Sequence, residues 1–226
     1  MKATLKNAIR LYRARRYSAS LQELHSLDED PGDLPELSYY LGLCYTQLEE
    51  YEEALIYLEQ VVTSDTDIVH IYQSRMILSY IYTITGRYRL AQFELDSLLE
   101  SGYESAQVYA AYGFVAYETS RYEDAIEYLQ KAIEIDPGNA NALNSLGFIL
   151  ADRGRNLEHS LELCKKAVEI DDSNSAYLDS LGWVHFKLGD YDEARAYLRR
   201  ALAGSSGDKD VALHLRTVIE QGNKKR

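Results

Sequence analysis

Apolar residues recur along this chain at the spacing of amphipathic helices. One clear set is Val108, Tyr109, Tyr112, Val115 and Ala116. A second set follows at Ala125, Ile126, Leu129, Ala132 and Ile133. Both follow the i, i+3, i+4, i+7 spacing that places side chains on one face of a helix. No stretch of alternating apolar and polar residues is long enough to predict a β-sheet. The pattern therefore predicts an all-α fold built from pairs of helices.

The helix pairs recur with a period of about 34 residues, which indicates a repeat protein. One template fits six segments, 1–34, 35–68, 72–105, 106–139, 140–174 and 175–208. Three of its columns matter most. Position 8 holds Ala8, Gly42, Ser79, Gly113, Gly147 and Gly182; position 20 holds Ser20, Ala54, Ala91, Ala125, Ser160 and Ala194; position 24 holds Leu24, Leu58, Leu95, Leu129, Cys164 and Leu198. The two small columns predict close approach of the paired helices, and each pair should contact only its neighbours.

Two segments carry this pattern most clearly. They are YAAYGFVAYETSRYEDAIEYLQKAIEIDPGN at 109–139 and YLDSLGWVHFKLGDYDEARAYLRRAL at 177–202. Their order of aromatic, small and apolar positions resembles the tetratricopeptide repeat (TPR), and the resemblance covers about nine-tenths of the chain. The early repeats depart from the family at position 27, where Leu27, Val61 and Leu98 stand in place of the usual Ala. The LDSLGW run resembles a phrase common in bacterial members. The resemblance implies a right-handed α-solenoid of six helix-turn-helix repeats.

Several details of the helices can be predicted as well. Residues 69–71 are surplus to the template and are expected to lengthen the first helix of the third repeat. Residues 209–221 predict a helix that caps the last repeat, and residues 222–226 form a basic tail. Left-handed helix ends are expected at Gly86, Gly154 and Gly189. Asp33 and Glu36 form a capping-box pattern ahead of Pro35.

The resemblance also implies a candidate binding surface. In the family, the first helix of each repeat lines a concave face through positions 2, 5, 9, 12 and 13. Position 9 here is apolar throughout and aromatic in the last four repeats. The candidate groove residues are Tyr39, Leu43, Tyr80, Phe114, Tyr117, Asn144, Phe148, Asp179, Trp183 and Phe186. Aromatic residues dominate binding hot spots, so this row favours a groove for a peptide or amphipathic helix of a partner protein.

Other interpretations of the aromatic row stay open. Position 9 could pack against the neighbouring repeat, or the groove could be filled by the chain's own terminus or by a second copy. The protein would then be a structural or self-associating module. A regulatory subunit of an enzyme complex is a third possibility. One partner class is disfavoured. Co-chaperones of the family hold a C-terminal carboxylate through Lys at position 5 and Asn at positions 6 and 9, followed by basic residues at positions 2 and 6, and only Lys2 and Lys6 match here.

The sequence carries no pattern typical of an enzyme, a metal site or a cofactor site. The five histidines lack the spacing of a metal-binding HExxH motif, and His185 stands at a packing position, where a core histidine with its polar groups satisfied is expected. Phosphate-binding and nucleophile motifs are also missing. Cys44 and Cys164 occupy apolar columns three repeats apart, so both are expected to be buried, reduced thiols. The sequence therefore predicts a protein that is not an enzyme.

Charge and hydropathy narrow the classes of partner. The formal net charge is −12 at pH 7, which argues against binding nucleic acid through its phosphates. The basic residues before Glu23 are either a solvated face or a docking patch for an acidic partner or a membrane surface. No apolar stretch reaches the ~18 residues of a membrane span, and no signal-peptide pattern follows the N-terminus. A cytoplasmic protein is expected, or a periplasmic or membrane-associated one if a leader was removed.

Overall fold

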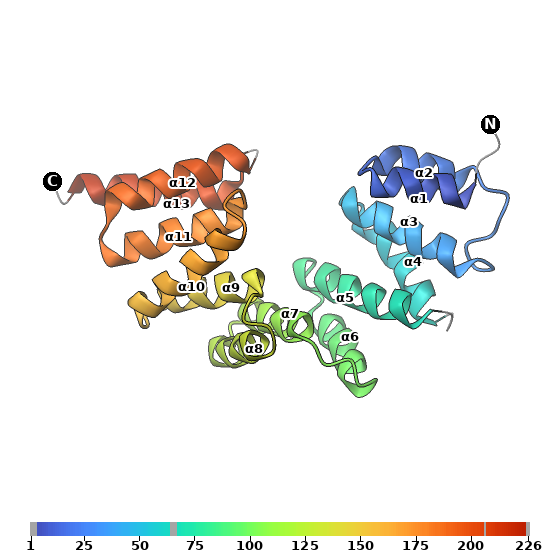
Figure 1. The fold of residues 1–226 in the computed structure, drawn as a ribbon, viewed down its shortest axis with the longest axis horizontal. Helices are drawn as coiled ribbons and strands as arrows, with labels where there is room; N and C mark the ends of the chain where they lie inside the picture. The colour runs from blue at the N-terminus through green and yellow to red at the C-terminus, as the bar shows by residue number, and fades with distance from the viewer. Residues whose placement is uncertain (1–3, 64–66, 206, 225–226) are drawn as a thin grey trace. The chain divides into compact units, whose positions relative to one another are not determined.

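The computed structural model describes residues 4–63, 67–205 and 207–224 and is all-α within these ranges (Figure 1). It contains thirteen helices and no strand there. They are α1 (Leu5–Arg13), α2 (Tyr17–His25), α3 (Pro35–Gln47), α4 (Tyr51–Thr63), α5 (Ile68–Ile84), α6 (Tyr88–Glu100), α7 (Ala106–Glu118), α8 (Tyr122–Ile135), α9 (Ala140–Asp152), α10 (Leu157–Ile170), α11 (Ser175–Leu188), α12 (Tyr191–Gly204) and α13 (Lys209–Lys224).

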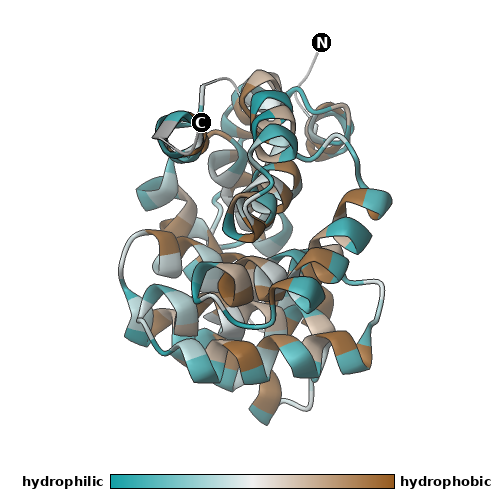
Figure 2. Cartoon of the chain, turned by 90° about the vertical axis from the view of Figure 1, so that its left-hand side faces the viewer, coloured by the Kyte–Doolittle hydropathy of each residue, from teal (hydrophilic) through white to brown (hydrophobic). Residues whose placement is uncertain are grey.

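The chain divides into an N-terminal unit, Met1–Glu104, and a C-terminal unit, Ser105–Arg226. Within each unit, consecutive helices form pairs, such as α3 with α4 and α7 with α8, and each pair contacts the next one along the chain. Figure 2 shows that the helices carry both apolar and polar residues, as amphipathic helices do. This stacking of helix pairs confirms the predicted α-solenoid arrangement.

Glycine at position 8 allows the two helices of a repeat to pack closely. A Cβ atom added to Gly113 would lie 2.6 Å from Leu129 Cγ and 3.4 Å from the carbonyl oxygen of Ala125. The same crowding recurs in three other repeats, between Gly42 and Leu58, Gly147 and Cys164, and Gly182 and Leu198. The glycine at position 8 therefore packs against the side chain at position 24 and against the backbone at position 20. The predicted close approach of the small columns is confirmed.

Serine at position 20 adds a hydrogen bond to the same contact. Ser20 Oγ donates to the carbonyl oxygen of Ala8 at 2.8 Å, and Ser160 Oγ donates to that of Gly147 at 2.6 Å. Both hydroxyls are buried, where an unpaired polar group would be costly. A serine therefore fits this column as well as alanine does, because the neighbouring helix supplies an acceptor.

The helix ends agree with the sequence in most places. The backbone φ angles of Gly86, Gly154 and Gly189 are +75°, +65° and +90°, so all three are left-handed as expected. Helix α5 has 17 residues and begins at Ile68, so the surplus residues 69–71 are helical. The predicted capping box of Asp33 and Glu36 was wrong. Because Pro35 is the first helical residue, Leu34 is the N-cap, and it makes no side-chain cap hydrogen bond.

Helix α13 extends further than expected. It reaches Lys224 rather than residue 221, so part of the expected basic tail is helical. Residues 225 and 226, and Lys2 at the other end, lie outside the described residues. Within the described ranges, no helix combines the length and the apolar character that crossing a membrane requires. The same residues contain no group of three or more His, Cys, Asp or Glu that could hold a metal ion.

The buried titratable groups are packed among the helices. Cys44 and Cys164 are free and buried as expected, and burial raises the pKa of the Cys164 thiol to about 12. His185 is buried as expected and its ring stacks on Tyr197, but its Nδ1 has no hydrogen-bond partner, so the expectation that its polar groups are satisfied was wrong. The His185 Nδ1 atom lies 3.5 Å from a carboxylate oxygen of Asp190, beyond good hydrogen-bond geometry.

The N-terminal unit contains a buried ion pair. Arg75 Nη1 lies 2.5 Å from Glu94 Oε2, and Glu94 is 6% exposed. Burial raises the pKa of the Glu94 carboxyl, while the charge of Arg75 opposes that rise. The carboxylate is thus costly to bury and depends on Arg75 as its counter-ion.

Candidate functional site

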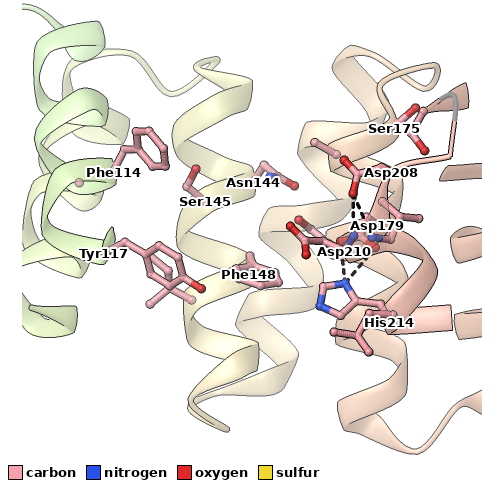
Figure 3. A pocket seen from close by; sticks show the side chains of 17 residues that line it. Phe114, Tyr117, Asn144, Ser145, Phe148, Ser175, Asp179, Asp208, Asp210 and His214 are labelled. Carbon is pink, nitrogen blue, oxygen red and sulfur yellow. Dashed lines mark hydrogen bonds and ion pairs between the residues drawn. The ribbon is translucent and has the colours of Figure 1, made fainter. Parts of the chain in front are cut away.

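The C-terminal unit contains a pocket with a volume of about 540 Å³, called here the aromatic pocket (Figure 3). Helices α7, α9, α11 and α13 and the turn before α13 form its walls. Five of the candidate groove residues line it, namely Phe114, Tyr117, Asn144, Phe148 and Asp179. These residues come from positions 5, 9 and 12 of three successive repeats, so the repeat register itself brings them together.

Aromatic side chains form the α7 and α9 side of the pocket. Phe114 and Phe148 occupy position 9 of neighbouring repeats, and Tyr117 lies one turn after Phe114. The rings of Tyr117 and Phe148 are 6.2 Å apart in an edge-to-face arrangement. Burial, followed by the charge of Asp152, raises the pKa of the Tyr117 hydroxyl, so this side chain stays neutral. The wall is therefore apolar and uncharged.

A carboxylate and an imidazole hold the α11 and α13 side together. His214 Nδ1 lies 3.0 and 2.9 Å from the two carboxylate oxygens of Asp179, which is 9% exposed. An ionised carboxylate only accepts hydrogen bonds, so Nδ1 carries the proton. Figure 3 shows the opposite edge of the ring, with Nε2, turned toward the pocket. The pair fixes α13 against α11 and so sets the width of the pocket.

Two more polar groups complete the pocket. Asp208 Oδ1 accepts hydrogen bonds from the backbone N–H groups of Asp210 and Val211, at 2.8 and 3.3 Å, and so caps the start of α13. Asn144 lies between the aromatic side and the Asp179–His214 pair (Figure 3). Its Oδ1 atom is buried and has no hydrogen-bond partner. A buried acceptor without a partner is costly, so this atom is poised to receive a donor.

Trp183 and Phe186 were expected in the groove but do not line the aromatic pocket. The Trp183 ring stacks on the His214 ring, with their centres 4.3 Å apart, and it packs against the buried cluster that contains Cys164. Phe186 packs against the cluster of Ala194, Leu198 and Val218. Helix α13 supplies His214 and Val218, so it covers both aromatic residues. This part of the predicted aromatic row is therefore covered by α13.

The three remaining candidates lie in the N-terminal unit and do not line this pocket. Tyr39 and Leu43 are 6% and 8% exposed and share a buried cluster with Val61. Tyr39 also stacks on His70 with ring centres 4.0 Å apart, and His70 belongs to the extra turn of α5. That added turn therefore covers a position that was expected to be open. Tyr80 is 47% exposed.

Sequence reasoning missed the contribution of α13 to the pocket. Asp208 is the last residue of the sixth repeat, and Asp210 and His214 lie beyond it, so no template position assigns these residues to the concave face. Their segment was predicted only as a cap. The available signal was Asp208, an N-cap residue just before the amphipathic helix. It marks where α13 begins but does not show which way the helix turns.

Three family models match the chain. One tetratricopeptide repeat model matches residues 5–67, a TPR repeat model matches residues 113–154, and another tetratricopeptide repeat model matches residues 138–206. The matched residues thus fall in both units. No curated protein matches the sequence.

Solved structures of repeat proteins resemble this fold. YrrB, a TPR protein with an unusual peptide-binding site, aligns with a TM-score of 0.52 and 20% identity, over 80% of this chain and 91% of its own. A tetratricopeptide repeat protein from Parabacteroides merdae ATCC 43184 aligns with a TM-score of 0.76 and 13% identity, over 95% and 83%. A chain of the APC/C hetero-tetramer Cut9–Hcn1 aligns with a TM-score of 0.78 and 15% identity, over 95% and 42%.

At these identities the structural likeness shows the fold. The family models match the sequence itself and so assign the repeat family. The helix pairs and the glycine columns described above agree with that assignment. The chain belongs to the tetratricopeptide repeat family.

Proposed function

We propose that this protein is a non-enzymatic interaction scaffold that holds a segment of a partner protein in the aromatic pocket. TPR proteins bind other proteins or peptides, so the fold itself suggests a scaffold. The observation that carries the proposal is the row of Phe114, Tyr117 and Phe148 along one wall of an open pocket. Aromatic residues of this kind provide most of the binding energy in protein interfaces.

The size and lining of the pocket favour a peptide segment. A volume of about 540 Å³ lies within the range of well-formed ligand sites. The apolar wall offers contact area to side chains, while Asn144 Oδ1 offers an acceptor to a backbone or side-chain N–H. The related fold of YrrB, with its unusual peptide-binding site, supports this choice of ligand.

The Asp179–His214 pair fits a structural role better than a catalytic one. Nucleophilic catalysis by such a pair requires a hydroxyl or thiol within hydrogen-bond reach of the imidazole. Among the described residues, no serine or cysteine makes a hydrogen bond to His214. The imidazole instead stacks on Trp183 and anchors α13, which is why we propose a binding role for this site.

A peptide selection tests the proposed function. The full chain is immobilised, a phage-displayed library of random peptides is selected on it, and the selected peptides are synthesised for affinity measurements. Phe148→Ala is expected to weaken binding by about 2 kcal/mol or more, roughly thirtyfold, since it removes an aromatic anchor.

Phe93→Ala serves as the matched control. Phe93 lies on α6 in the N-terminal unit and is 59% exposed, so the same truncation there should leave affinity unchanged. Thermal melts of both variants verify that they remain folded. Peptides that bind Phe148→Ala as tightly as the wild-type chain would refute the proposal.

A further inference from the structure

We infer that the aromatic pocket binds an arginine side chain of the partner segment, flanked by apolar residues. This inference rests on the proposed function and specifies its ligand. It follows from the charges around the pocket, from the hydrogen-bonding character of its polar groups and from its aromatic wall.

The charged groups of the pocket are predominantly acidic. Asp179, Asp208 and Asp210 line it, and no lysine or arginine is among the described residues that do so. Lys187, on the same helix as Asp179, contacts other partners. Lys187 Nζ lies 3.0 Å from the carbonyl oxygen of Asp152, and its charge also faces the Trp183 ring. A ligand with positive charge is therefore complementary to the pocket.

Carboxylate and amide oxygens give the pocket several hydrogen-bond acceptors. His214 Nδ1 donates to Asp179, and its Nε2 faces the pocket (Figure 3). Asn144 Oδ1 is a buried acceptor without a partner. Asp208 already accepts two backbone N–H groups, but its second carboxylate oxygen and both oxygens of Asp210 extend the acidic rim. A ligand with several N–H donors satisfies this set.

Arginine meets these requirements better than lysine. Its guanidinium is planar, carries five N–H donors and stacks on aromatic rings, whereas the lysine ammonium is a compact, strongly hydrated charge. The same kind of contact occurs elsewhere in this unit, where the Arg153 guanidinium lies 4.4 Å from the centre of the Tyr122 ring. The wall of Phe114, Tyr117 and Phe148 offers equivalent faces to an incoming side chain.

The peptides selected on the wild-type chain provide the probe. Arginine next to an aromatic or aliphatic residue should be enriched among them. Each arginine is then replaced by citrulline, which keeps the shape and most donors but removes the charge, and in a second peptide by lysine. Replacement by citrulline should weaken binding by roughly 2- to 30-fold, the range for losing two weak exposed ion pairs. Lysine should restore part of this loss. Salt should weaken the arginine peptide more than the citrulline peptide.

A variant of the protein tests the same inference by removing two negative charges from the pocket while keeping the N-cap of α13. The double variant Asp208→Asn and Asp210→Asn keeps an asparagine at the N-cap, which caps a helix as well as aspartate does. It should reduce affinity for the arginine peptide by a similar factor and leave the citrulline peptide unaffected. Asp179 is left intact because it anchors His214. The control is the double variant Glu127→Gln and Glu134→Gln, which removes the same number of negative charges at exposed positions of α8. It should leave the affinities for the arginine peptide and for the citrulline peptide unchanged.

The outcomes separate this inference from the proposed function. Peptides that require Phe148 but lack arginine, or that tolerate citrulline, would overturn the inference and leave the scaffold proposal standing. An equal loss in the α8 control would show a general charge effect and would also overturn it. If no selected peptide depends on Phe148, both proposals fail.

Discussion

Replacing Gly113 by alanine tests the close helix contact, because two opposing effects are predicted at this position. Alanine favours the helix interior over glycine by roughly 0.5–1 kcal/mol. The added Cβ, however, would lie 2.6 Å from Leu129 Cγ and 2.8 Å from Leu129 Cδ2. Overpacking of this kind costs roughly 1–3 kcal/mol, so the net effect of Gly113→Ala is a destabilisation of about 0–2.5 kcal/mol.

The sign should reverse when Leu129 is shortened. Leu129→Ala removes both crowding atoms, at its own cost of about 2–5 kcal/mol. In that background only the helix preference remains, so Gly113→Ala should stabilise by roughly 0.5–1 kcal/mol. The double-mutant cycle therefore predicts a coupling energy of about 1–3 kcal/mol between the two positions.

Urea denaturation of the four proteins measures this coupling. Trp183 is the single tryptophan of the chain, so its fluorescence reports unfolding of the C-terminal unit. A fixed concentration of sucrose in every sample keeps the least stable variant folded. Gly138→Ala is the control, since a Cβ there meets nothing closer than 3.4 Å and should be neutral or slightly stabilising. An identical effect of Gly113→Ala in both backgrounds would refute the packing argument.

Three further predictions concern buried groups and the terminal helix. Cys164 should react with a thiol reagent only on unfolding, because it is buried and its raised pKa of about 12 leaves almost no thiolate near neutral pH; rapid labelling without denaturant would contradict this. The raised pKa of Glu94 means that the folded state binds its proton more tightly than the unfolded state does. In thermal melts, the stability of the wild-type chain relative to Glu94→Gln should therefore fall as pH rises above the ordinary glutamate pKa of 4.5 toward neutrality. A stability difference that rises with pH would show that the charge of Arg75 dominates. Deleting residues 209–226 should shift Trp183 emission to the red and promote aggregation, since α13 covers that ring; unchanged emission would show that the ring was already solvated.

The fold could be predicted because the repeat fixes which positions meet. Gly113 and Leu129 occupy columns 8 and 24, and their contact follows from the same spacing in every repeat. The aromatic wall was also predictable, since Phe114 and Phe148 share one column. Repeat periodicity carries this information because each helix pair packs against its neighbours in the same way.

The other parts of the site depended on segments outside the repeat register. Trp183 shares the column of Phe148 but lies under α13, whose direction no template position specifies. Tyr39 was expected to be open, yet three surplus residues lengthen α5 and bring His70 over its ring. In both cases an irregular segment changed a regular column from exposed to covered. Column patterns alone do not show which parts of a concave face such segments fill.

Helix α13 has a consequence for the dynamics of the C-terminal unit. Within the described residues its backbone packs mainly on α12 and, less closely, on α11, so it has fewer neighbours than the helices inside the unit. In an array held by nearest-neighbour contacts, a helix with fewer neighbours opens by local unfolding at a lower free energy than helices packed on both sides. The wall that carries His214 should therefore exchange its amide hydrogens before α7 and α9 exchange theirs. One side of the pocket is preorganised, while the side that α13 forms is expected to fluctuate more.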